Sequence, residues 1–512
     1  MNRVRLAFVL LVALTDRVAA QTSQGSIKHG HNEGAFARSG IADWSTPPTP
    51  SSEPAFDPPH AQRFRLANGI AVWLIENHAL PIVSMTLLAA GAGAAADPPG
   101  QGGLAAFTAD LLDEGVNGES ALAIAGEEAR LGADIDIDVG PDAAEVSVDT
   151  LTSTVDGTLD LLTRIVTQPT FNMREAERVK GDLVTSLALR RDRPREVASL
   201  VLNGALFGSD SPYGHPIAGV LDQFSQLSAS DARTFYRQHW SPEVVTLIVA
   251  GDVDARRLQT ALQSALGAWR PNHLVLPLMA AGPVASTPLP SAVPIAPLSR
   301  LHLVDRPDAA QTDLRIGLVG PERRDPRFFA FEVLRTVLGD GFTSRLVQRL
   351  REQLGITYGA AAEMQWRNSP GPFVISSAID TPETGRGISE IIKLVDALAT
   401  TEVPVAELEK SKESMIRALP AEFETNENTA DAFAELVLLG LPDDFYAHYA
   451  EGVRKVTAAE VRSAAKTLLP SDRLVFSLVG DVKKVRAALD PLKLGATQLY
   501  DPAGKPVSAP QR

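Results

Sequence analysis

Two stretches decide the fold: LSASDARTFYRQHWSPEVVTLIVAGDV at residues 227–253 and VTAAEVRSAAKTLLPSDRLVFSLVGDV at residues 456–482. Each reads as a helix that begins after a Ser or Thr, then a turn with Ser and Pro, then an apolar strand that ends in Gly-Asp-Val. The two stretches are 229 residues apart in numbering, from 227 to 456. The same offset aligns VWLIENHALPIVSMTLLAAG at 72–91 with LHLVDRPDAAQTDLRIGLVG at 301–320. Each of these reads as strand, turn and strand. Two pairs of segments with one offset indicate a duplicated α+β domain of about 200 residues, in which an antiparallel sheet packs against helices.

The rest of the chain divides around these repeats. Residues 21–60 are rich in Ser, Gly and Pro, and we expect them to be disordered because they cannot bury a core. A proline-rich stretch at 271–297 reads as a linker between two domains at 61–270 and 298–492. Residues 493–512 are expected to form a polar tail.

The N-terminal segment MNRVRLAFVLLVALTDRVAAQ is typical of a secretory signal peptide. It has Arg3 and Arg5, an apolar run at 6–14 and small residues at 18–20 that suit a cleavage site. We therefore expect residues 1–20 to be removed and the mature protein to lie in a bacterial periplasm, away from the membrane. An uncleaved membrane anchor is the alternative, although the apolar run is short for spanning a bilayer.

Composition excludes several classes of function. The chain has 512 residues, of which 45% are hydrophobic and 21% charged, so sizeable cores can form. Its net charge of −14 would repel a phosphate backbone, and we expect no nucleic-acid partner. With no cysteine, the chain can form no disulfide, thiolate metal site or cysteine nucleophile.

Four further stretches resemble the pitrilysin/insulinase family of zinc metallopeptidases, the inverzincins, to which the mitochondrial processing peptidase is related. They are NGIAVWLIEN at 68–77, GLAAFTADLL at 103–112, SPYGHPIAG at 211–219 and VLGDGFTSRLVQRLREQLGITYG at 337–359. By their order and spacing the resemblance covers residues from about 62 to 490. It implies two tandem homologous domains, each an antiparallel sheet packed with helices.

The zinc motif of that family is altered here. An active member carries His-x-x-Glu-His on the first helix, where the two imidazoles hold zinc and the Glu is the base for the zinc-bound water. Matching Gly103 and Leu104 to the family's lead-in places these three residues at Ala106, Ala109 and Asp110. A methyl group neither ligates a metal nor accepts a proton. We therefore expect a degenerate site and no zinc bound by this chain.

The family's third zinc ligand is a Glu that lies about 75 to 80 residues further along the chain. The matching stretch at 174–196 has no Glu between Glu177 and Glu196. Glu175 and Glu177 lie too early for that position, and their helical spacing predicts that both are solvated.

Two groups of acidic residues have alternative interpretations. Asp110, Asp113 and Glu114 crowd the C-terminal part of the first helix, where we expect a neighbouring Lys or Arg to offset their charge. A substitute metal site built from these carboxylates stays an alternative. In DIDIDVGPD at 134–142 the acids alternate with apolar residues, which predicts a solvated face of a strand rather than a calcium site.

The second repeat keeps a pair that the family uses on its substrate. Catalytic members contribute an Arg and a Tyr from the C-terminal domain, close to the scissile bond. In SRLVQRLREQLGITYG at 344–359, Arg351 and Tyr358 have the commoner spacing of seven residues, with Gly355 as the expected end of the helix. The resemblance assigns both to substrate binding. On spacing alone, Arg351 would be a surface residue and Tyr358 a half-buried strand aromatic.

Some bacterial members of the family are split into a zinc-bearing subunit and a subunit with the Arg/Tyr pair. The resemblance therefore implies a non-catalytic, substrate-binding subunit of a periplasmic heterodimeric peptidase. Its partners would be a paralogue that holds the zinc and extended peptides that bind between the two subunits. Two alternatives stay open: an autonomous metallopeptidase with unorthodox ligands, and a purely structural scaffold.

Overall fold

The computed structural model describes residues 56–209, 211–270 and 299–507. The chain divides into two compact units, and every helix and strand below belongs to the unit Asp57–Arg512. The signal peptide, most of the Ser/Pro-rich segment and the linker at 271–297 lie outside the described residues, so these predictions stay untested. Among the described residues, no helix has both the length and the hydropathy needed to cross a bilayer.

The first repeat contains a six-stranded sheet in the order β1-β2-β8-β3-β7-β6. Its strands are β1 (Gln62–Arg65), β2 (Ala71–Glu76), β3 (Ile82–Ala90), β6 (Asp134–Val139), β7 (Ala143–Leu151) and β8 (Val245–Gly251). A separate hairpin joins β4 (Gly115–Val116) and β5 (Glu119–Ser120). The helices are α1 (Leu104–Ala109), α2 (Ala121–Leu131), α3 (Val155–Thr167), α4 (Met173–Leu189), α5 (Pro194–Phe207), α6 (Leu221–Phe224), α7 (Ala229–His239) and α8 (Ala255–Ala265).

The second repeat contains a seven-stranded sheet in the order β11-β12-β10-β13-β9-β14-β15. Its strands are β9 (Ser299–Asp305), β10 (Gln311–Val319), β11 (Thr357–Met364), β12 (Pro372–Asp380), β13 (Val475–Gly480), β14 (Ala496–Tyr500) and β15 (Pro506–Val507). The helices are α9 (Phe328–Gly339), a π-helix (Val347–Gln353), α10 (Thr384–Thr400), α11 (Val405–Ala418), α12 (Asn426–Leu438), α13 (Phe445–Lys455), α14 (Ala458–Leu468) and α15 (Val482–Leu489).

The predicted duplication is confirmed strand by strand. The order β2-β8-β3-β7-β6 in the first sheet repeats as β9-β13-β10-β12-β11 in the second, with β2 parallel to β8 and β9 parallel to β13. Even the register is shared, because Met85 pairs with Val249 and their equivalents at the predicted offset, Leu314 and Leu478, pair with each other. The central strands β3 and β10 are buried on both faces, which explains why they read as continuous apolar runs.

The two decisive helices begin where the sequence predicted. In α7 the Ser228 side chain accepts from the N–H of Asp231, whose carboxylate accepts from the N–H of Ser228. Thr457 and Glu460 form the same reciprocal bonds at the start of α14. Each capping box satisfies two of the N–H groups that a helix start leaves without a partner.

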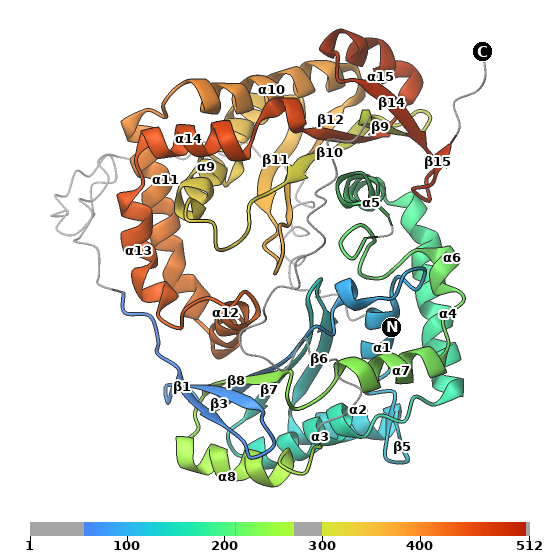
Figure 1. The fold of residues 1–512 in the computed structure, drawn as a ribbon, viewed down its shortest axis with the longest axis vertical. Coiled ribbons are helices and arrows are strands. Elements are labelled where there is room, and N and C mark those ends of the chain that lie inside the picture. The colour runs from blue at the N-terminus through green and yellow to red at the C-terminus, as the bar shows by residue number, and fades with distance from the viewer. Residues whose placement is uncertain (1–55, 210, 271–298, 508–512) are drawn as a thin grey trace, which may run out of the picture. The chain divides into compact units, whose positions relative to one another are not determined.

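The repeats exchange one helix each, which the sequence did not predict. Helix α5 belongs to the first repeat, but its residues pack on strands β9, β10, β12 and β13 of the second sheet. Helix α12 belongs to the second repeat, but Phe433 on it packs with Leu88 and Ile248 of the first sheet. Figure 1 shows both helices against the sheet of the other repeat. Because each sheet needs a helix from the other half, the repeats form one compact unit.

Two boundaries differ from the sequence prediction. The segment expected to be a polar tail contains β14, which pairs in parallel with β9, and β15, which pairs with β14. Backbone hydrogen bonds to an open sheet edge order this segment although it has few apolar residues. The first helix ends at Ala109, so only Asp110, its C-cap, adds charge to the helix end. Five of its six residues are buried, so α1 is not amphipathic.

Candidate functional site

The helix that carries the family's zinc motif is held by a buried carboxylate. Asp97 accepts hydrogen bonds from the backbone N–H groups of Gly103 and Ala105, each at 2.7 Å. Gly103 has φ of +96°, which favours glycine, and it lets the chain turn into α1. Burial raises the pKa of Asp97 to about 7, although both hydrogen bonds act to lower it. The backbone of α1 is thus fixed in place independently of any metal.

The residues at the zinc positions do not fit a zinc ion. Ala106 and Ala109 present methyl groups, and Ala109 is only 1% exposed within the packed core. Asp110 supplies one carboxylate at the third position. Zinc needs at least three protein ligands in a catalytic site, and both histidines and the glutamate base of the motif are missing.

No downstream ligand replaces them. The window about 75 to 80 residues after Asp110 falls on TSLALR at 185–190, which has no acid, and Leu187 there is buried. Glu177 is exposed on α4 as expected, whereas Glu175 is half-buried and accepts from Arg178 at 2.9 Å. Among the described residues, no group of three or more His, Asp or Glu side chains could hold a metal ion.

Arg178 on α4 is the cation that offsets the charge of the carboxylates after α1. Arg178 on α4 forms an ion pair with Glu114, and it also contacts Asp182 at 3.4 Å. Burial, followed by repulsion from Asp113, raises the pKa of Asp110 to about 7. Burial and the neighbouring Glu114 raise the pKa of Asp113 to about 6. This cluster is therefore anchored by the ion pair at Glu114, and burial makes Asp110 and Asp113 hold a proton to higher pH than exposed carboxyls do.

The alternating acids form a solvated sheet face, as predicted. Asp134, Asp136 and Asp138 on β6 are exposed, and the apolar residues between them are half-buried. Asp138 lies opposite Glu145 on β7, and like charges placed opposite each other destabilise a sheet. Burial, together with repulsion from Asp431 and Asp138, raises the pKa of Glu145 to about 7. This acidic face belongs to the first repeat.

The segment SPYGHPIAG packs on the start of α1. Gly219 has φ of +72°, and a Cβ there would lie 2.1 Å from the carbonyl oxygen of Gly102. Arg190 donates to the carbonyl oxygen of Gly219 at 2.7 Å. The ring of His215 is largely buried, with Nδ1 3.9 Å from Asp97 and 3.2 Å from a backbone carbonyl oxygen, and burial lowers its pKa. His215 therefore supports the turn before α1.

Sequence reasoning missed a buried contact that links the repeats. Asp142 accepts hydrogen bonds from the Tyr213 hydroxyl and, at 2.9 Å, from the backbone N–H of Asn368 in the second repeat. The guanidinium of Arg367 lies 4.7 Å from the centre of the Tyr213 ring. The only signal in the sequence is an acid in a Gly-Pro-Asp turn, which is too common to identify a contact partner.

Arg351 lies on a helix and Tyr358 on the strand that follows it, and Tyr358 is exposed rather than half-buried as its spacing alone predicted. Arg351 is on the π-helix, which Gly355 ends with φ of +63°, and Tyr358 is the second residue of the edge strand β11. Tyr358 is 88% exposed, and within the described residues its hydroxyl has no hydrogen bond. The Arg351 side chain is 41% exposed and contacts Glu352 at 3.4 Å. Neither residue is needed to fill the core.

An exposed aromatic that the sequence analysis overlooked lies beside Arg351. Phe342 is 72% exposed in the loop after α9, and the Arg351 guanidinium lies 5.3 Å from its ring centre. A cation over an aromatic face is favourable by about 0.5 to 1 kcal/mol at exposed sites. The signal that could have found Phe342 is a large apolar residue between the glycine and threonine of a turn.

The fold defines a class of proteins with two homologous α+β halves that exchange a helix, here with the metal-binding residues replaced. Comparison with protein families agrees, because "Insulinase (Peptidase family M16)" matches residues 72–212 and "Peptidase M16 inactive domain" matches residues 226–415. The chain belongs to the M16 (insulinase) peptidase family, which confirms the resemblance seen in the sequence, and the descriptions of the matched domain and of one relative support a non-catalytic member.

Similar proteins come from diverse bacteria. An uncharacterized zinc protease of Mycobacterium tuberculosis (strain H37Rv) is 25% identical over 376 residues, 72% of this chain and 81% of the relative. A non-peptidase homolog of Helicobacter pylori is 21% identical and covers 80% of this chain and 91% of its own. The crystal structure of a peptidase M16 inactive domain from Pseudomonas fluorescens has a TM-score of 0.73 at 23% identity, covering 82% of this chain and 98% of that one.

Proposed function

We propose that this chain is the non-catalytic, substrate-binding subunit of a periplasmic heterodimeric zinc peptidase. In this proposal Arg351 and Tyr358 reach the active site of a paralogous partner that carries the zinc motif. The observation that carries it is the contrast between a dismantled metal site and an exposed Arg/Tyr pair. The signal-peptide pattern at residues 1–20 supports the periplasmic location.

Exposure of the pair supports a role outside this chain. The large side chains of Tyr358 and Phe342 are exposed, so burial within this chain does not stabilise them. Exposed aromatic groups of this kind mark surfaces that contact another molecule. The Arg351 guanidinium and the Tyr358 hydroxyl both donate hydrogen bonds. They can stabilise a peptide carbonyl oxygen as it gains negative charge, so the pair suits an extended peptide held near the partner's metal.

The expected size of this effect follows from similar donors. Removal of one oxyanion-hole donor lowers turnover by about 100- to 1,000-fold, which corresponds to about 3 to 4 kcal/mol of transition-state stabilisation. We therefore expect Arg351→Ala and Tyr358→Phe each to lower turnover by at least about 100-fold. Both variants should still bind the partner, because the apolar residues Leu346 and Leu350 that anchor this region remain buried.

The test is turnover of a model peptide by the full chain reconstituted with a paralogue from the same genome that has His-x-x-Glu-His. Arg386→Ala on α10 is a matched control, because Arg386 is also exposed and forms an ion pair with a nearby Glu383. Control activity should equal that of the wild type. Unchanged turnover in the Arg351→Ala, Tyr358→Phe double variant would reduce the chain to a scaffold. About one zinc per lone chain, together with peptidase activity, would establish the autonomous peptidase instead.

A further inference from the structure

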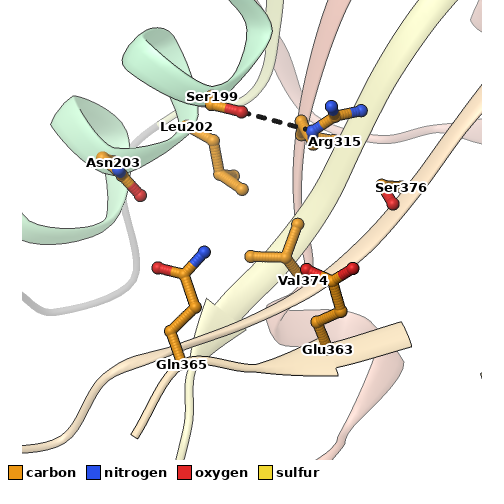
Figure 2. Close-up of a pocket in the computed structure, with 8 residues that line it drawn as sticks. All are labelled: Ser199, Leu202, Asn203, Arg315, Glu363, Gln365, Val374 and Ser376. Atoms are coloured by element: carbon orange, nitrogen blue, oxygen red, sulfur yellow. Dashed lines mark hydrogen bonds between the residues drawn. The ribbon is translucent and has the colours of Figure 1, made fainter. Parts of the chain in front are cut away.

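A small cavity lies between α5 and the sheet of the second repeat (Figure 2). Its volume is about 200 Å³, below the roughly 300 to 1,000 Å³ of pockets for drug-sized ligands. Polar side chains from both repeats line it, among them Asn203 from α5, Arg315 from β10, and Glu363 and Gln365 at the end of β11. The cavity therefore suits a small polar molecule.

Arg315 gives the cavity a positive charge without an ion-pair partner. Its Nε donates to the Ser199 hydroxyl at 3.2 Å, and its Nη1 donates to a main-chain oxygen at 3.0 Å. Burial lowers the pKa of Arg315, but a guanidinium stays protonated in proteins. In the described part of the chain Arg315 forms no ion pair, and the nearest acid on its strand, Asp313, contacts Arg195 at 3.5 Å. The geometry leaves Arg315 able to bind a carboxylate.

Glu363 supplies the opposite charge. Figure 2 shows Glu363 and Gln365 across the gap from Ser199 and Arg315. Glu363 is exposed and, like Arg315, has no ion pair within the described ranges. The Gln365 amide oxygen accepts from Arg367 at 3.1 Å, so its amide nitrogen is fixed as a donor. The cavity thus offers a cation and an anion that attract each other across it without forming a direct ion pair.

Two apolar residues complete the cavity. Leu202 on α5 and Val374 on β12 are buried and line it between the charged groups. They can cover a methyl or methylene group, but the small volume leaves no room for a long side chain.

We propose that this cavity binds a free α-amino acid with a small side chain. The ligand carboxylate contacts Arg315, and the ligand ammonium contacts Glu363. Charge-assisted hydrogen bonds of both kinds are about twice as strong as neutral ones, which favours a zwitterion over a neutral molecule. This site is separate from the Arg/Tyr pair, and it does not depend on the proposed function.

The equivalent positions of the first repeat carry different residues. At the offset that relates the repeats, Thr86 is the equivalent of Arg315, and Glu145 is the equivalent of Val374. There the acidic Asp138 and Glu145 lie opposite each other without an arginine. The equivalent surface of the first repeat would therefore repel a carboxylate.

Calorimetric titration of the full chain tests the site, with glycine, L-alanine and L-serine as the probes. We expect saturable binding of at least one of them in the micromolar to millimolar range. Arg315→Gln and Glu363→Gln should each weaken that binding by about 10- to 100-fold, because each removes a hydrogen bond to a charged group. Arg386→Gln and Glu383→Gln, an exposed pair on and beside α10, are matched controls and should bind as the wild type does.

Capped ligands separate the two charges. N-acetyl-L-alanine lacks the ammonium and L-alaninamide lacks the carboxylate, so both should bind about 10-fold more weakly than L-alanine or worse. Glu363→Gln keeps the test informative if Arg315→Gln misfolds, because Glu363 is exposed. The proposal is overturned if none of the three amino acids binds. It is also overturned if N-acetyl-L-alanine binds as tightly as L-alanine, since the site would then recognise a carboxylate alone, such as a peptide C-terminus.

Discussion

The two repeats have the same backbone plan and different surfaces. Strand order and register agree between them, and buried pairs such as Met85–Val249 and Leu314–Leu478 occupy equivalent positions. The exposed chemistry differs, because the first repeat has an acidic strand face and alanines at the metal positions. The second has Tyr358 in solvent and Arg315 in a cavity. Buried residues therefore preserve the fold, while a few accessible side chains determine what each half can bind.

The exchanged helices tie the structure of each repeat to the other. Phe433 on α12 lies in a cluster with Leu88 of the first sheet, and its ring centre is 6.1 Å from that of Trp73. Val201 on α5 is equally buried against Val479 of the second sheet. Each sheet is thus covered by a helix that belongs to the other repeat, so apolar packing between the repeats stabilises both sheets.

The largest expected effect comes from breaking this exchange. Phe433→Ala should lower the free energy of unfolding by about 3 to 5 kcal/mol, because it leaves a cavity between α12 and the first sheet. Val201→Ala should cost about 2 kcal/mol on the other side, since fewer buried atoms are lost. Urea unfolding followed by circular dichroism measures both.

Leu122→Ala is the control for these two variants, because Leu122 is 83% exposed and its loss should change the free energy by less than about 0.5 kcal/mol. The shape of the transition is as informative as its midpoint. Both core variants should keep one cooperative transition. If Phe433→Ala unfolds the first repeat in a separate step, the repeats do not depend on each other as the exchange implies.

A moderate, pH-dependent effect distinguishes the remnant of the zinc site from an ordinary acidic surface. The pKa of Asp110 is raised to about 7 from its usual 3.8. Between these values the folded state holds a proton that the unfolded state has released, so the free energy of unfolding falls as pH rises from 4 to 7. Asp110→Asn removes the part of this dependence that Asp110 contributes, while the buried Asp97 and Asp113 keep theirs. The variant should be more stable than the wild type by about 1 to 2 kcal/mol at pH 8.

The gap should close at acidic pH, where Asp110 is protonated in both states. Thermal unfolding of the wild type and the variant across this pH range is the measurement. Asp134→Asn on β6 is the matched control, because Asp134 is an exposed acid of the same repeat. A metal bound by Asp110 would reverse the sign, since Asp110→Asn would then destabilise the protein at pH 8.

Much of the fold could be predicted because it is encoded locally. The helix starts at Ser228 and Thr457 and the apolar strands before each Gly-Asp-Val are signals within a few residues. The exchange of α5 and α12 could not be predicted in this way. An amphipathic segment shows that one face is buried, but both sheets offer the same kind of apolar surface, so the pattern does not identify the covering partner.

The site shows the same division between local and distant information. The positions of Ala106 and Ala109 followed from a motif, and the need for a cation near Glu114 followed from charge. That the cation is Arg178 depends on how α4 packs. The sequence analysis did not predict strand β14, because this strand is held by backbone hydrogen bonds to β9 and its side chains show no strand pattern. The cavity at Arg315 was missed because its walls come from segments far apart in the sequence.

The smallest expected effect on stability comes from Tyr358, and comparing it with a packed tyrosine of the first repeat tests directly how the two repeats differ. Tyr236 in the first repeat is a half-buried aromatic that packs against the core, and its hydroxyl donates to the carbonyl oxygen of Val166 at 2.7 Å. Tyr236→Ala should therefore cost about 3 to 5 kcal/mol. Tyr358→Ala should change the free energy of unfolding by less than about 0.5 kcal/mol, because its side chain is 88% exposed. Chemical denaturation of both variants makes the comparison. A loss above about 1 kcal/mol for Tyr358→Ala would mean that the ring stabilises β11 within this chain. A neutral result would show that this chain does not need the exposed phenol of Tyr358 for folding. That is what we expect of a residue whose role is to bind a peptide.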